Sequence, residues 1–302
     1  MIGAEAERMV CEKLPGGDCP NDFEDRVGAS PILVEQARSS PARKLQGIGI
    51  IDNAADLKCS VLADVDCTHL KVGVRRKQVR VVKEPQGCVH GTMSLSLMGG
   101  KTRKQRYGVV SGVGHFRYAI LDVFGEAKKT HEDRVTTAIQ WIATKNAREF
   151  NLQTVVIPLQ QDKPPIGSSN PILHAVKARK NRNKLFVFAA GDNPDFSNCL
   201  LAGSLNALPS NVRVVGHAGV HKATNENIWL LSKQSWYIGS NPEASSPISQ
   251  VSPSTSANCV VAGGAVALVS LLTGKASCEV AKASNEHGVS AESLLKHFGT
   301  QV

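Results

Sequence analysis

A run of small and aliphatic residues near the carboxyl end of the chain limits its possible folds more than any other feature. Residues 259–272 contain no charged side chain, and charge returns only at Lys275. A membrane span needs about 20 apolar residues, whereas this run is shorter and contains Gly263 and Gly264. Because a helix that is apolar on every side must be buried, we predict a core helix of a globular domain and no membrane span.

Hydroxyl side chains stand directly before this run, at Ser254, Thr255 and Ser256. The start of a helix has unpaired N–H groups and the positive end of the helix dipole, so it stabilises negative charge nearby. A serine there is well placed to act as a nucleophile. Serine and threonine are also common N-caps, so this feature alone leaves both interpretations open.

The rest of the chain alternates apolar, β-branched runs with helical patterns, which is typical of an α/β domain. We expect a mostly parallel central sheet with helices on both faces. Strands are expected at residues 45–52, 79–82, 118–123, 154–159, 184–190 and 212–216, and helices at residues 32–38, 90–98, 135–143 and 171–179. No linker-like stretch divides the pattern, so residues 45–302 are predicted to form one domain and residues 1–44 an N-terminal arm that wraps around it.

Composition sets limits on the partners of the chain. The 302 residues are 42% hydrophobic and 20% charged, as in ordinary soluble proteins, and the net charge is +9. Basic clusters at residues 75–77, 101–106 and 177–184 could attract nucleic acid, an anionic membrane or acidic proteins. Aromatic residues do not interleave with these clusters, so bases have no platform on which to stack. We do not expect nucleic acid as a partner, and a basic scaffold that docks on it is the least favoured interpretation.

Cysteine spacing and the first residues bear on the compartment. The eight cysteines include no CxxC pair, which argues against a zinc knuckle or a redox motif, and no metal site is predicted. The N-terminal segment has neither the basic start nor the apolar stretch of a signal peptide. We therefore expect a cytoplasmic protein with reduced cysteines.

Two upstream residues are placed where catalytic groups occur. Asp52 ends an apolar strand, and in parallel sheets functional groups gather at the carboxyl ends of strands. An aspartate that starts a turn is also common. His90 opens a helix of small and apolar residues, where a lone histidine is often a buried core residue. Together with Ser256 these residues give the order Asp, His, Ser.

Three motifs in this order resemble the family of subtilisin-like serine proteases, peptidase family S8. They are Ile-Ile-Asp-Asn around Asp52, His90-Gly91-Thr92, and Thr255-Ser256-Ala257. The similarity runs over residues 31–272, with segments 118–120, 137–142 and 187–191 in the family's order. The order Asp, His, Ser is also that of subtilisin. The resemblance implies a single-domain subtilisin-like fold and a serine endopeptidase.

The resemblance also implies a role for each residue. Ser256 would attack the peptide carbonyl, His90 would take and return the proton, and Asp52 would hold the histidine tautomer. The peptide or protein substrate would pair in extended form with the segment Pro158-Leu159-Gln160. This chemistry uses no metal and no organic cofactor.

The register of the nucleophile has two solutions. In the family a glycine follows the nucleophilic serine by eight residues, so Gly264 indicates Ser256 and Gly263 indicates Thr255. Ser256 also keeps a threonine before it and aliphatic residues at the expected places, and we prefer it.

Departures from the family keep a second function open. Asp192 stands where the family has an asparagine that donates to the oxyanion, and loss of that donor in subtilisin lowers kcat about 10² to 10³-fold. Asn193 would restore the donor if the turn shifts by one residue, and a protonated Asp192 would also do so. The residues before Asp52 are too few for the family's folding propeptide, so no autoprocessing is expected. The alternative is a catalytically weak or inactive protein of this fold that binds a peptide or protein partner.

Overall fold

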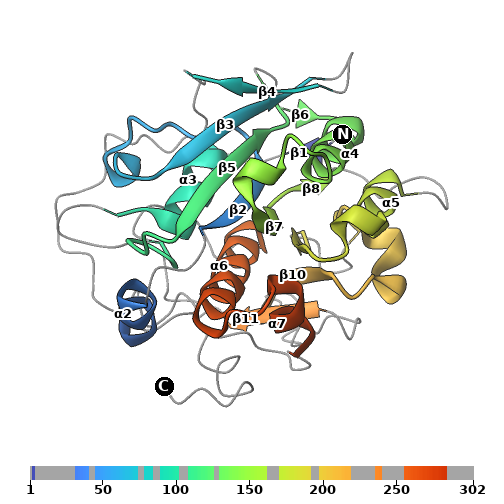
Figure 1. Cartoon of the computed structure of the whole chain (residues 1–302). Helices are drawn as coiled ribbons and strands as arrows, with labels where there is room; N and C mark the ends of the chain where they lie inside the picture. Colours follow the sequence, from blue (N-terminus) through green and yellow to red (C-terminus); the bar gives the residue numbers. More distant parts are fainter. Residues whose placement is uncertain are drawn as a thin grey trace.

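The central element of the fold is an eight-stranded sheet that is parallel except at one edge (Figure 1). The computed structural model describes residues 2–3, 31–40, 45–73, 78–83, 89–101, 108–125, 129–161, 170–191, 197–218, 235–239 and 255–283. Across the sheet the strands follow the order β11 (Ser235–Gly239), β10 (Val212–Ala218), β9 (Leu185–Ala189), β7 (Leu152–Ile157), β2 (Gln46–Asp52), β5 (Phe116–Asp122), β3 (Cys67–Val72) and β4 (Val79–Val82). Only the β3–β4 pair is antiparallel.

Helices cover both faces of this sheet, as the sequence predicts. On one face lie α2 (Pro31–Ser39), α3 (Val89–Gly99), α6 (Thr255–Thr273) and α7 (Ser277–Ala283), and on the other α4 (Glu132–Ile142) and α5 (Pro171–Lys177). Strand β2 shows why two covers are needed, because Ile48 and Ile50 enter the core under α6 while Ile51 enters the core under α4. Strands that are buried on both faces consist of apolar residues without polar alternation, which explains the continuous runs in the sequence.

Helix α6 is the predicted core helix. It is long and apolar enough to cross a membrane, yet 83% of its apolar stretch is buried inside the protein. The glycines of this helix permit a close approach to the sheet, since a Cβ at Gly263 would lie 2.2 Å from Cγ1 of Val156 in β7. The structure therefore confirms the interpretation of this run as a buried helix of a globular domain.

Three very short strands form a second sheet beside the first. Strand β1 (Ile2–Gly3) lies between β6 (Lys129–Thr130) and β8 (Gln160–Gln161) and is antiparallel to both. Four 3₁₀ helices complete the described elements: η2 (Ser60–Leu62), η3 (Arg148–Phe150), η4 (Arg179–Asn181) and η5 (Ala202–Ala207). The N-terminal region thus contributes β1 and α2, and the predicted boundary at residue 44 stays a prediction.

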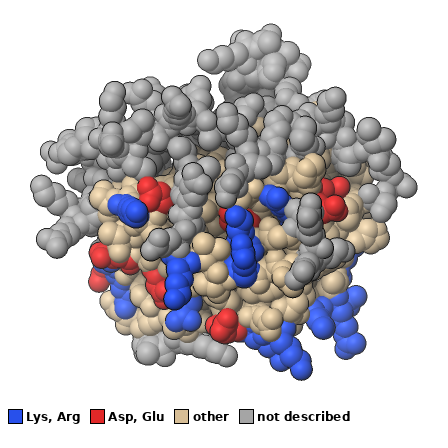
Figure 2. Space-filling view, turned by 90° about the horizontal axis from the view of Figure 1, so that it is seen from above, with Lys and Arg blue, Asp and Glu red and all other residues tan. Residues whose placement is uncertain are grey.

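Charged side chains are dispersed over the face seen in Figure 2. Lysine and arginine lie there in separate groups, with aspartate and glutamate between them. Where this face is described, it presents no continuous basic stripe of the kind that follows a nucleic acid backbone.

Candidate catalytic site

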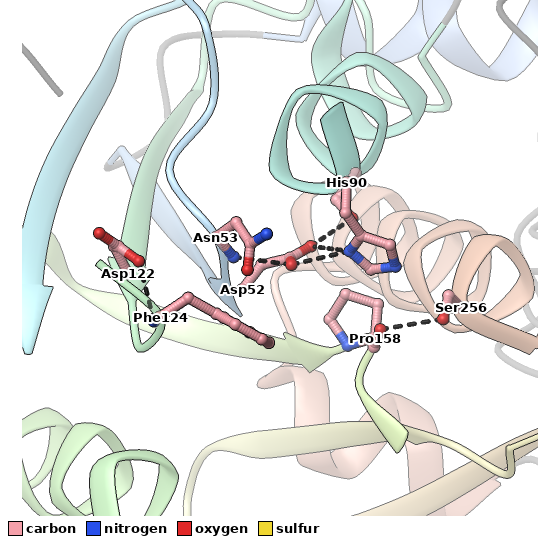
Figure 3. Close-up of polar contacts among 8 residues, drawn as sticks. Asp52, Asn53, His90, Asp122, Phe124, Pro158 and Ser256 are labelled. Atoms are coloured by element: carbon pink, nitrogen blue, oxygen red, sulfur yellow. Dashed lines mark hydrogen bonds and ion pairs between the residues drawn. The ribbon is translucent and has the colours of Figure 1, made fainter. Parts of the chain in front are cut away.

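The site is built at the carboxyl edge of the central sheet, where β2 ends in Asp52. Asp52 is fully buried, and its Oδ1 accepts a hydrogen bond of 2.7 Å from the backbone N–H of Asn53. Asp122 ends the neighbouring strand β5 directly opposite Asp52. The Asp122 carboxylate accepts instead from the N–H groups of Phe124 and Gly125, so it serves the turn after β5 (Figure 3). Of these two strand-terminal aspartates, Asp52 is the one hydrogen-bonded to His90.

His90 lies in the first turn of α3 and contacts Asp52 through Nδ1. Nδ1 lies 2.8 Å from Oδ1 and 2.9 Å from Oδ2, so the imidazole faces the carboxylate almost symmetrically. Both side chains are buried, with His90 only 5% exposed. A carboxylate on Nδ1 fixes the proton there and leaves Nε2 as the basic atom. Figure 3 shows the Nε2 side of the ring directed toward Pro158 and Ser256.

Close packing of α3 on the loop after β2 sets this geometry. A Cβ at Gly91 would lie 2.1 Å from the carbonyl oxygen of Asn53, so only glycine lets the helix start there. Two side chains bind the same loop: Thr92 Oγ1 accepts from the N–H of Asp56, and His69 Nε2 accepts from the N–H of Ala55. Burial lowers the pKa of His69, which keeps the ring neutral and able to accept. These two acceptors hold the loop in place.

Ser94 joins this arrangement and was not anticipated from the sequence. Its Oγ donates a hydrogen bond of 2.6 Å to Oδ2 of Asp52, and the side chain is fully buried. Ser94 follows His90 by one helical turn, and residues four apart on a helix share a face. This spacing is the only signal in the sequence that could have indicated the contact.

Ser256 lies in the first turn of α6, at the same edge of the sheet. Its hydroxyl donates a hydrogen bond of 2.9 Å to the carbonyl oxygen of Pro158, the residue that follows β7 (Figure 3). Ser256 is half-buried, whereas Thr255, the other candidate nucleophile, is buried and only 5% exposed. The structure therefore brings Asp52, His90, Ser256 and Pro158 to one edge of the sheet.

The other predicted substrate-binding residues differ in their surroundings. The side chain of Leu159 is fully buried in the core under α4, so only its backbone can meet a ligand. Gln160 belongs to β8, where it pairs with Gly3 of β1 and its Oε1 accepts from Nδ2 of Asn198. One edge of the predicted peptide-binding strand is thus already paired with the chain's own amino end.

The predicted oxyanion residues, Asp192 and Asn193, lie outside the described residues. Gly191 precedes them with a φ of +85°, a left-handed conformation that favours glycine. A Cβ there would also lie 2.1 Å from Oδ1 of Asn198. The oxyanion assignment stays a prediction.

A thiol lies near Ser256, but it is not a second source of nucleophilic chemistry. Cys259 follows Ser256 by one turn, but its Sγ donates to the carbonyl oxygen of Val187 and burial raises its pKa. A buried thiol of this kind is a poor nucleophile, because the thiolate is the reactive form. Within the described residues, no group of three histidine, cysteine, aspartate or glutamate side chains is placed to bind a metal ion.

Similarity to known proteins is found in the structure and not in the sequence. No family model and no curated protein matches the sequence. Solved structures match over most of the chain. The nisin leader peptidase NisP from Lactococcus lactis has a TM-score of 0.64 at 13% identity, covering 92% of this chain and 94% of NisP. The prenylagaramide maturation protease PagA has a TM-score of 0.60 at 15% identity, covering 88% of this chain and 98% of PagA.

Two further matches carry the same fold in other contexts. Fervidolysin from Fervidobacterium pennivorans, a keratinolytic enzyme related to subtilisin, has a TM-score of 0.64 at 13% identity, covering 98% of this chain and 50% of fervidolysin. The PatG macrocyclase, solved in complex with peptide, has a TM-score of 0.62 at 14% identity, covering 93% of this chain and 99% of PatG. The structural similarity establishes the shared fold. At identities this low the chemistry does not carry over and must be argued from the site itself.

Proposed function

We propose that this chain, which has the fold of the subtilisin-like serine proteases, is a serine endopeptidase that acts through Asp52, His90 and Ser256. The observation that carries the proposal is the buried pair of Asp52 and His90, joined through Nδ1. A buried carboxylate on Nδ1 is the arrangement by which serine hydrolases orient a general base. Ser256 adds a hydroxyl at the start of a helix, on the side to which Nε2 is directed.

In the proposed reaction, Ser256 Oγ attacks the carbonyl carbon of a peptide bond while its proton passes to His90 Nε2. Asp52 stabilises the imidazolium that forms. His90 then gives the proton to the leaving nitrogen, the C–N bond breaks, and an acyl-enzyme remains on Ser256. Water attacks the ester by the reverse sequence of proton transfers and releases the acid. The positive end of the α6 dipole favours the oxyanion of both tetrahedral intermediates.

The proposed substrate is a peptide bound in extended form. Strand β8, which begins two residues after Pro158, is the candidate for β-strand addition, and its backbone is paired with β1 on one edge and with Cys199 on the other. The carbonyl oxygen of Pro158, which accepts from Ser256, lies at the nucleophile end of this segment. Because β1 already pairs with β8, a peptide that uses the same edge has to replace it.

A second candidate is a peptide-binding protein of this fold with little or no turnover. The observation that favours it is the hydrogen bond from Ser256 to the Pro158 carbonyl, because a hydroxyl that donates there does not donate to His90. The presence of Asp192 in place of the family's asparagine also favours this second candidate.

Labelling with a fluorophosphonate separates these two functions. After incubation with the probe, mass spectrometry should find one adduct on the peptide that contains Ser256. The adduct should be lost in Ser256→Ala and in His90→Ala and retained in Thr255→Ala. A folded protein without any adduct would leave peptide binding as the function. An adduct lost only in Thr255→Ala would move the nucleophile to that residue.

A further inference from the structure

Asp52 receives three hydrogen bonds, and only one comes from the histidine of the proposed triad. Asn53 N–H donates to Oδ1 at 2.7 Å, Ser94 Oγ donates to Oδ2 at 2.6 Å, and His90 Nδ1 lies between the two oxygens. Each carboxylate oxygen therefore has one donor besides His90. Because the two additional donors come from opposite ends of the carboxylate, rotation of the group would break at least one of them.

Ser94 does not behave like an ordinary serine within a helix. Serines in helices commonly return their hydroxyl to the carbonyl four residues before, or point to solvent. Ser94 does neither, because its hydroxyl donates out of α3 to a strand of the sheet. Ser96, two residues later on the same helix, is also fully buried, and its hydroxyl has no hydrogen-bond partner. The two serines thus differ in the feature that matters here, a contact with Asp52.

Ser94 is also not a second nucleophile. A nucleophilic hydroxyl must reach Nε2 of the histidine and the substrate carbonyl. Ser94 instead contacts the carboxylate that faces Nδ1, and its side chain is fully buried. No peptide carbonyl can approach it there.

We propose that Ser94 is a positioning residue that fixes the plane and the charge distribution of the Asp52 carboxylate so that His90 is held in one orientation. The proposal rests on the proposed function, in which His90 is the base. Since Ser94 and His90 lie one turn apart on α3, the same helix carries the base and a donor that orients the base's partner. A small movement of α3 against β2 then shifts His90 and Ser94 together relative to the Asp52 carboxylate.

The hydroxyl also draws negative charge toward Oδ2. Donors to a carboxylate stabilise its ionised form and spread its charge. Without Ser94, more of the charge would be concentrated toward His90 Nδ1, which would attract the imidazolium proton more strongly. The protonated histidine would then be favoured up to higher pH, and the freed carboxylate could rotate away from the ring.

The test compares Ser94→Ala with Ser96→Ala in the intact chain. Both changes remove one buried hydroxyl from α3, but only the first removes a donor to Asp52. The first readout is nitrogen-15 NMR of the His90 imidazole as a function of pH, which requires no turnover. We expect the titration midpoint of His90 to rise by roughly half a pH unit in Ser94→Ala and to stay unchanged in Ser96→Ala. Ser94→Thr, which keeps the hydroxyl, should restore the parent value.

The second readout is the cleavage of a peptide substrate. Ser94→Ala should lower kcat about tenfold, the size expected for one lost hydrogen bond to a charged group, with KM unchanged. An unchanged His90 titration in folded Ser94→Ala overturns the proposal, as does an equal shift in Ser96→Ala. If fluorophosphonate labelling fails while the titration shift is found, the proposed function is wrong and the role of Ser94 stands. If labelling succeeds and the titration does not move, the reverse holds.

Discussion

The Asp52 side and the Ser256 side of the site differ in how completely their side chains are positioned. On the Asp52 side, each oxygen of the carboxylate is paired, the loop after β2 is held by Thr92 and His69, and the helix start abuts the loop at Gly91. On the Ser256 side, the hydroxyl donates to a backbone carbonyl and the neighbouring strand is paired with β1. The proposed acid–base half is therefore assembled in the structure as it stands, whereas the proposed nucleophile must give up its hydrogen bond to Pro158 to donate to His90.

The largest effect is expected from a substitution of Asp52, at the centre of the proposed acid–base half. Asp52→Asn keeps the size of the side chain but removes the charge and favours the wrong histidine tautomer. In a chymotrypsin-type protease the same change lowers kcat about 10⁴-fold, and we expect a loss of that order here. Steady-state cleavage of a peptide substrate measures it. A loss below tenfold in folded protein would contradict the role given to this carboxylate.

Gly91→Ala breaks the same half through its packing. The new Cβ would lie 2.1 Å from the backbone oxygen of Asn53, so α3 must move away from the loop. Overpacking of this kind destabilises a core by about 1–3 kcal/mol, and activity should fall with it because His90 is the preceding residue. Urea unfolding measures the loss of stability. Gly203→Ala, where no atom lies within 4 Å of the new Cβ, is the control and should leave both unchanged.

Substitutions in β1 test whether this strand competes with a substrate for β8, on the Ser256 side of the site. The double change Ile2→Pro/Gly3→Pro removes two backbone donors from β1 and should release β8 for a substrate. We expect KM to fall about 3 to 10-fold, which corresponds to one or two backbone hydrogen bonds, with kcat unchanged. Ile2→Ala/Gly3→Ala keeps both donors and should behave like the parent. Equal KM values in the two variants would mean that β1 does not compete with substrate.

The smallest expected effect concerns pH and His69. Burial holds the pKa of this histidine below its usual value of 6.5, and the neutral ring accepts from Ala55. Since the folded pKa is lower than the unfolded one, the neutral ring stabilises the fold above pH 6.5, and this contribution is lost as the pH falls toward the folded pKa. Thermal unfolding followed from pH 7 downward should show the loss. In His69→Gln, whose amide oxygen accepts at any pH, this part of the pH dependence should disappear.

The sequence predicts the assembled half better than the other half. Strands such as β2 and β9 are short, continuous apolar runs that end in polar turns, a pattern that favours strands buried on both faces of a parallel sheet. Asp52 and His90 stand at the end of one such strand and the start of a helix, so their approach follows from the topology of a parallel sheet. The motifs that identify Asp52 and His90 are local in the sequence, and the fold only has to bring these two residues together.

The nucleophile half depends on contacts that leave no local pattern. Strands β1, β6 and β8 have two residues each, too few to show an alternation of polar and apolar side chains. The hydrogen bond from Ser256 to Pro158 joins residues that are far apart in the chain. The contact of Ser94 with Asp52 was missed for the same reason, because a helix position four residues after His90 is polar or apolar according to what the sheet presents to it.

The glycine that lets α6 approach the sheet has a consequence beyond the core. Gly263 rests on Val156, two residues before Pro158, and Ser256 rests on Pro158 itself, about two turns earlier on the helix. Helix α6 thus contacts β7 and the residue that follows it at two points. A side chain at position 263 would push this part of α6 away from β7 and tilt the helix. The spacing between the proposed nucleophile and the proposed peptide-binding segment would then change, although neither is substituted. The geometry of the proposed catalytic site therefore depends on a contact in the buried core.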